Sequence, residues 1–169
     1  MNQSVSRRDL IVNRAAVLVW MIVIFIFSTD SFSSAQTTPF IAPLLSSLFP
    51  SLTEAHIENI GLLLRKLGHW SEYFILAVLL MRALRAEFPG PSAKRAIIWG
   101  VAFSVIYAIS DELHQSFVPS RSASAVDVSI DAIGAICGTL LSYRYNQRMR
   151  MDPNTTPARA VEAQSVEKT

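Results

Sequence analysis

The feature that most constrains this chain is a set of long apolar stretches joined by shorter polar connections. Residues 15–27 are apolar without a break. With the small polar residues on either side they give about 17–19 residues, near the minimum for a helix that crosses a membrane. Three further apolar stretches follow. We therefore predict an all-α, polytopic membrane protein, a compact bundle of four transmembrane helices at about residues 14–30, 67–84, 96–112 and 126–143.

Composition agrees with a membrane protein. Hydrophobic residues make up 51% of the chain and charged residues 17%, whereas soluble domains carry about 25% charged residues. The net charge of +2 is too small to indicate nucleic-acid binding, and the basic residues lie near the ends of apolar stretches. We expect one membrane domain over residues 1–145. The polar residues 146–169 are predicted to be a disordered cytoplasmic tail.

A cleaved signal peptide is the alternative for the first apolar stretch, because Ser33, Ser34 and Ala35 resemble a cleavage site. The further membrane segments favour a spanning helix instead. In the connection over residues 28–65, Pro39, Pro43 and other prolines are expected to interrupt regular structure. Two short amphipathic helices, residues 41–49 and 56–64, are expected to lie at the membrane interface.

The distribution of Lys and Arg predicts the orientation. These residues concentrate in the N-terminal segment, in residues 85–95 and in the C-terminal tail, whereas residues 28–64 contain none. The positive-inside rule then places both termini in the cytoplasm. With four spans, the unusual polar residues of separate segments converge at the outer side of the membrane.

These polar residues are the candidate functional site. Charges inside apolar segments are expensive, so each one is a functional hypothesis. Asp127, Asp131, Gly134 and Gly138 form one helical stripe, and the two glycines permit close approach of a second helix. We expect this stripe to face the bundle. The candidate site residues are Lys66, His69, Glu72, Asp111, Glu112, His114, Gln115, Arg121, Asp127 and Asp131.

Three chemical uses fit these residues. In acid–base catalysis, His69 or His114 would act while Arg121 or Lys66 binds an anionic group. In a metal site, a divalent cation would be held by oxygen and imidazole ligands. In the third use, the acids recognise a cation or an amine without chemistry. The candidate metal ligands are His69, Glu72, Asp111 and His114.

A structural explanation competes with all three uses. Lys66 and Arg121 would neutralise some of the acids, the histidines would be packing groups, and Glu112 would face the outer water. Tryptophan and tyrosine residues, among them Trp20 and Tyr107, are expected to be lipid-facing or interfacial anchors.

The linked motifs resemble the VanZ-like family, which is named for a membrane protein associated with teicoplanin resistance. The resemblance covers about residues 14–145, and Ser120 stands where the family often has Gly. It is carried by the patterns Lys66-x-x-His69-x-x-Glu72-Tyr73, Asp111-Glu112-x-His114-Gln115 with Pro119 and Arg121, and Asp127 with Asp131, Gly134 and Gly138.

The resemblance implies a small helical protein of the bacterial inner membrane that acts near cell-envelope precursors. Its expected partners are membrane lipids and an envelope precursor or glycopeptide-related ligand, in a resistance-type role. Two alternatives stay open: an enzyme acting on a lipid-linked or anionic envelope substrate, and a structural membrane subunit.

Overall fold

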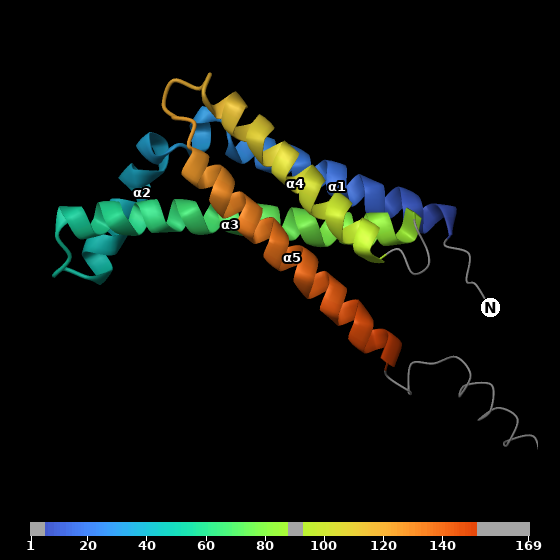
Figure 1. Cartoon of the computed structure of the whole chain (residues 1–169). Coiled ribbons are helices and arrows are strands. Elements are labelled where there is room, and N and C mark those ends of the chain that lie inside the picture. The colour runs from blue at the N-terminus through green and yellow to red at the C-terminus, as the bar shows by residue number, and fades with distance from the viewer. Residues whose placement is uncertain (1–5, 88–92, 152–169) are drawn as a thin grey trace, which may run out of the picture.

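The computed structural model describes residues 6–87 and 93–151, which are helical with short connections and contain no strand (Figure 1). Ser6 is the N-cap of the first helix, because its hydroxyl accepts a hydrogen bond from the Arg8 backbone N–H at 3.2 Å. The elements are α1 (Arg7–Phe27), the 3-10 helix η1 (Asp30–Phe32), α2 (Ser34–Leu48), α3 (Glu54–Glu87), α4 (Ala93–Gln115) and α5 (Ala125–Met151).

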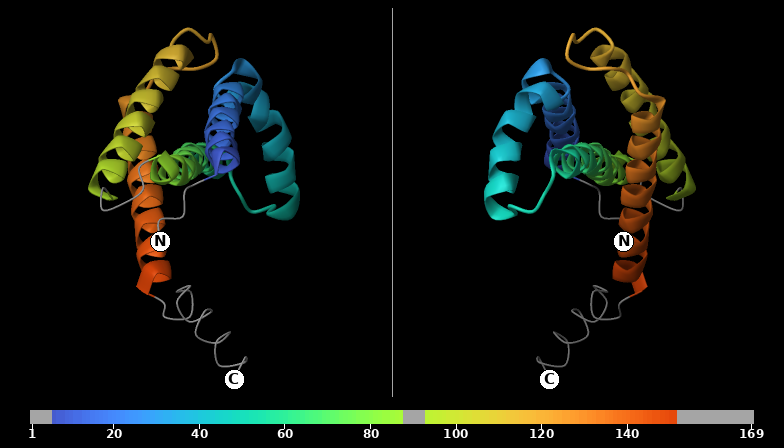
Figure 2. Two further views of the ribbon diagram at one scale, coloured as in Figure 1. Left: turned by 90° about the vertical axis from the view of Figure 1, so that its right-hand side faces the viewer. Right: turned by 90° about the vertical axis from the view of Figure 1, so that its left-hand side faces the viewer.

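Helix α3 lies at the centre of the molecule. It packs most extensively against α5 and also contacts α1, α4 and α2. Viewed along α3, α1 and α4 lie on either side of it, and α2 lies outside α1 (Figure 2). Every other long helix therefore contacts α3, and polar residues on several of its faces reach different neighbours.

The two glycines predicted to permit close packing lie where α5 crosses α3. A Cβ at Gly134 would lie 2.3 Å from the carbonyl oxygen of Trp70, and one at Gly138 would lie 2.3 Å from that of Phe74. The backbones of the two helices are therefore in direct contact. This confirms that the stripe with Asp127 and Asp131 faces the bundle.

Aromatic residues also join the helices. The Trp20 indole N–H donates to the Glu72 carbonyl at 2.9 Å, and the Tyr107 hydroxyl donates to the Met21 carbonyl at 2.7 Å. Both residues are half-buried and join helices, so they are not purely lipid-facing, and their expected place at the membrane interface stays a prediction. Their rings pack against a core that includes Tyr73, and their polar atoms bond across helices because lipid offers a half-buried N–H or O–H no hydrogen-bond partner.

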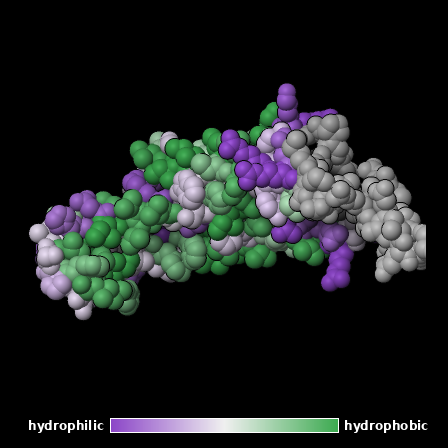
Figure 3. All heavy atoms as spheres, turned by 90° about the horizontal axis from the view of Figure 1, so that it is seen from below, coloured by the Kyte–Doolittle hydropathy of each residue, from purple (hydrophilic) through white to green (hydrophobic). Residues whose placement is uncertain are grey.

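Much of the outer surface is apolar. Large hydrophobic residues are exposed along α1, α4 and α5, and Figure 3 shows a broad apolar zone between more polar ends. Three helices of the described residues are long and apolar enough to cross a membrane: Arg7–Phe27, Lys94–Gln115 and Ala125–Met149. Their length and composition are those of a multi-pass membrane protein, whereas the fourth predicted span, residues 67–84, is not among these three helices.

The connection before that span is more helical than predicted. Pro39 and Pro43 lie inside α2, so the prediction that they interrupt regular structure is wrong. Residues 56–64 do not form a separate short helix either, because α3 is continuous over 34 residues, about 50 Å. Similarly, α5 continues past the predicted end of its span into residues 146–151. The rest of the predicted tail lies outside the described residues.

The backbone contact between α3 and α5 gives a direct prediction. Gly138→Ala places a methyl group against the Phe74 carbonyl, a backbone atom that cannot rotate away. We expect the helices to be forced apart at a cost of about 1–3 kcal/mol in the free energy of unfolding, measured as a lower melting temperature in detergent.

Gly61→Ala is the matched control for this prediction. A Cβ at Gly61 meets no atom within 4 Å, and alanine has the higher helix propensity. Its melting temperature should therefore stay unchanged or rise. Equal destabilisation by the two substitutions would contradict the close contact.

Candidate functional site

The first half of the site lies between α3 and α5, beside their glycine contact. Asp127 lies in the first turn of α5 and faces two cations of α3. Lys66 Nζ lies 3.2 Å from Asp127 Oδ1, and Arg65 Nη2 lies 3.4 Å from Oδ2. One turn further along α5, Asp131 Oδ1 lies 3.3 Å from His69 Nδ1. Asp131 is fully buried and His69 nearly so, so this pair is shielded from solvent.

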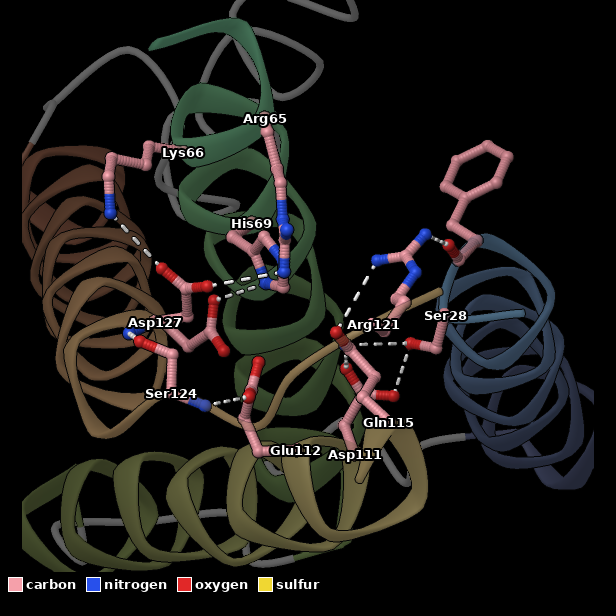
Figure 4. Close-up of polar contacts among 12 residues, drawn as sticks. Ser28, Arg65, Lys66, His69, Asp111, Glu112, Gln115, Arg121, Ser124 and Asp127 are labelled. Carbon is pink, nitrogen blue, oxygen red and sulfur yellow. Dashed lines mark hydrogen bonds and ion pairs between the residues drawn. The ribbon is translucent and has the colours of Figure 1, made fainter. Parts of the chain in front are cut away.

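Glu112 connects α4 to the start of α5 (Figure 4). Its Oε2 accepts a hydrogen bond from the Ser124 backbone N–H at 2.6 Å, and the Ser124 hydroxyl accepts one from the Asp127 backbone N–H at 3.3 Å. These bonds occupy N–H groups that a helix start leaves free. Glu112 is only 4% exposed, so the expectation that it faces the outer water is wrong.

The second half of the site joins the end of α1 to the end of α4 (Figure 4). The Ser28 hydroxyl donates to Asp111, and the Gln115 amide donates to Asp111 Oδ2 at 3.0 Å. Arg121, in the following loop, donates to the Gln115 side-chain oxygen at 3.4 Å and to the Phe27 carbonyl at 2.5 Å. The loop is thereby held against the carboxyl end of α1.

A pocket of about 300 Å³ lies beside both halves. Its polar lining includes Arg65, His69, Glu72, Gln115 and Arg121. Burial lowers the pKa of the Arg121 guanidinium, and the positive charge of Arg65 lowers that pKa further. The remaining walls come from α1, η1, α2 and the first half of α3 and are mostly apolar: Phe27, Phe32, Ile41, Ala42, Ile57 and Leu64.

The structure does not group the candidate metal ligands as the sequence suggested. His114 packs on the ring of Phe25, with 4.7 Å between ring centroids. Of the described His, Cys, Asp and Glu residues, the group with ligand atoms within 4.8 Å of one another is His69, Glu112 and Asp127. The ligand set that the structure offers a cation therefore differs from the set expected from the sequence, and only His69 belongs to both.

A sequence model of the VanZ/LLP1 family matches residues 14–146, which is most of the chain. The chain belongs to the VanZ/LLP1 family. No curated protein and no solved structure matches it.

The VanZ/LLP1 match includes every candidate site residue. The two segments that carry the strongest resemblance, residues 66–73 and 111–121, are on α3 and on α4 with its following loop. They meet at the pocket, where His69 and Glu72 of the first segment lie with Gln115 and Arg121 of the second.

Sequence reasoning missed several members of the site. Arg65 lines the pocket and pairs with Asp127. Its spacing of four residues from His69 was the available signal, since this spacing places both on one helix face. Ser28 and Ser124 gave no signal, because small polar residues at the ends of apolar stretches are ordinary. Only the fold brings Ser28 to Asp111 and Ser124 to Glu112.

The ion pairs of Asp127 predict a stability effect. Asp127→Asn removes the charge that faces Arg65 and Lys66, whose side chains are 26% and 43% exposed. We expect a loss of about 2 kcal/mol in the free energy of unfolding, between the values typical of exposed and of buried pairs. Thermal unfolding in detergent measures it.

Glu87→Gln is the comparison for this substitution. It removes the partner of Arg14 in an ion pair whose side chains are 60% and 39% exposed, and should cost at most about 1 kcal/mol. If Asp127→Asn is no more destabilising than Glu87→Gln, the ion pairs of Asp127 do not stabilise the junction of α3 and α5.

Proposed function

We propose that this VanZ/LLP1-family membrane protein binds an anionic, lipid-like molecule of the cell envelope in the pocket between α1, α2 and α3. The observation that carries the proposal is that one pocket contains two arginines and is otherwise lined mostly by apolar residues. Arg65 and Arg121 suit a phosphate or carboxylate group, because guanidinium groups bind such anions through paired hydrogen bonds.

The arginines are close enough to affect each other. The positive charge of Arg65 lowers the pKa of Arg121 because the two guanidinium groups repel each other. An anion between them would relieve this repulsion. Arg65 has one ion pair, to Asp127, at the long distance of 3.4 Å, so donor capacity remains for a ligand.

The size and walls of the pocket favour a lipid-like ligand. A volume of about 300 Å³ is at the low end of small-molecule pockets. It suits a head group with the first part of a hydrocarbon chain, and it is small for an entire glycopeptide. Phe32 and Ile41 would contact the chain, while the head group meets the arginines.

We further propose that the pocket faces the outside of a bacterial inner membrane, with both termini in the cytoplasm. This orientation requires α3 to be a fourth span. Burial supports it, because polar residues within α3 such as His69 and Tyr73 face the bundle, whereas Leu67 and Ile75 are exposed. A pocket at the outer surface would give access to envelope precursors and is compatible with a resistance-type role.

Ligand binding tests the proposal. The protein in detergent is titrated with undecaprenyl phosphate, with phosphatidylglycerol and with teicoplanin, and binding is measured by native mass spectrometry. We expect saturable binding of the lipid phosphate. Arg65→Gln and Arg121→Gln should each weaken it about tenfold, the equivalent of about 1.4 kcal/mol, because each removes a charged hydrogen-bond donor.

Arg82→Gln is the matched control for these variants. Arg82 is an exposed arginine in the last turns of α3, so its loss changes net charge equally without touching the pocket. The proposal is abandoned if lipid phosphate does not bind, or if all three variants weaken binding to the same extent. Tight binding of teicoplanin instead of lipid would replace the proposed ligand.

A second candidate function is acid–base catalysis on the same ligand. The observation in its favour is the pair of His69 and Asp131, since His69 lines the pocket and Asp131 supports it from the buried side. Such a pair is typical of a general base with an orienting carboxylate. Incubation of the protein with the bound lipid, followed by lipid mass spectrometry, distinguishes the candidates: turnover that is absent in His69→Asn supports an enzyme.

Orientation has its own test. A green fluorescent protein fused after Val161 should fluoresce, and an alkaline phosphatase inserted in residues 116–124 should be active, since only the latter requires export. An inactive phosphatase at that loop would place the pocket on the cytoplasmic side. A non-fluorescent C-terminal fusion with an active phosphatase at that loop would mean that α5 does not return the chain to the cytoplasm.

A further inference from the structure

Three side chains with metal-binding atoms meet where α3, α4 and α5 converge. His69, Glu112 and Asp127 each offer one donor atom, and these atoms lie within 4.8 Å of one another. Each residue comes from a different helix, and all three are buried. The fold therefore brings an imidazole nitrogen and two carboxylate oxygens to one point inside the bundle.

Carboxylate oxygens in and beside this cluster lack hydrogen-bond partners. Glu112 Oε1 and, beside the cluster, Asp131 Oδ2 are buried without a hydrogen-bond donor, in residues that are 4% and 0% exposed. Leaving such oxygens unpaired costs free energy unless a donor or a cation reaches them. Asp131 lies against His69, and a carboxylate beside a ligating histidine is a common outer partner in metal sites because it orients the ring.

The region around the cluster has an excess of negative charge that a bound cation would offset. Arg65 and Lys66 pair with Asp127, and Arg121 donates to Gln115 and to a backbone carbonyl. None of these described bonds reaches the other acids of the region. The acids, which outnumber the three cations by two, are Glu72, Asp111, Glu112, Asp127 and Asp131.

We propose that His69, Glu112 and Asp127 bind a divalent transition-metal ion, with Asp131 as the positioning residue for His69. Mixed imidazole and carboxylate donors suit ions such as Zn²⁺, whereas Mg²⁺ and Ca²⁺ prefer oxygen ligands and water. Ligand bonds to Zn²⁺ are about 2.0–2.2 Å long, and the donor atoms, all within 4.8 Å of one another, can reach such an ion with small side-chain shifts. His69 belongs both to this cluster and to the lining of the pocket, so the metal is tested on protein without added lipid.

Binding of the metal alone tests the proposal. Chelator-treated protein in detergent is titrated with ZnCl₂ by calorimetry, and bound zinc is counted by mass spectrometry after gel filtration. We expect one ion per chain, a higher melting temperature with Zn²⁺ than with chelator, and no such rise with MgCl₂. Glu112→Gln and His69→Asn should weaken binding at least about tenfold.

His56→Asn is the matched control, because His56 is exposed near the start of α3 and lies outside the cluster. Absence of saturable binding to the wild-type chain would overturn the proposal. So would equal affinity in the wild type, Glu112→Gln and His69→Asn, which would indicate adventitious zinc.

A folding defect in His69→Asn would not obscure the result. Glu112→Gln keeps the shape of the side chain and leaves an oxygen that accepts from the Ser124 backbone N–H, so this variant should fold. The stoichiometry and zinc-dependent melting of the wild type do not depend on any variant. Lipid phosphate binding, measured separately on the zinc-free protein, keeps failure of the metal site distinct from failure of the proposed function.

Discussion

The direct backbone contact between α3 and α5 is the interaction on which the rest of the structure depends. Gly134 and Gly138 let α5 approach the carbonyl groups of α3 without intervening side chains. At this separation Asp127 reaches the cations of α3, and Asp131 reaches His69. Charged groups in an apolar bundle are tolerated when they face one another, because lipid does not solvate them.

The polar groups of the remaining helices extend from this contact. Glu112 of α4 accepts a hydrogen bond from Ser124, the residue just before α5, so the position of α4 is coupled to that of Asp127. Asp111 and Arg121 then join α4 and its loop to the end of α1. One connected polar junction thus holds α1, α3, α4 and α5 together at one end of the bundle, with the pocket beside it.

The same residues belong to the polar junction and to the lining of the pocket. Arg65 pairs with Asp127 and lines the pocket, and His69 contacts Asp131 and lines the pocket as well. A substitution at either position changes the junction and the pocket together. Measurements of binding are therefore informative only beside measurements of folding, and the exposed Arg82 and His56 provide the comparison.

The sequence alone determined the all-helical, membrane-spanning character and the family, because unbroken apolar runs and linked motifs are local properties of the chain. It also predicted that the Asp127 and Asp131 stripe faces inward. Only the tertiary structure decided that Glu112 is buried, that Arg65 belongs to the site and that His114 packs on Phe25. Those outcomes depend on which helices meet and at what depth. The spacing of Gly134 and Gly138 indicates a close helix crossing, but it does not say which distant segment takes part in it.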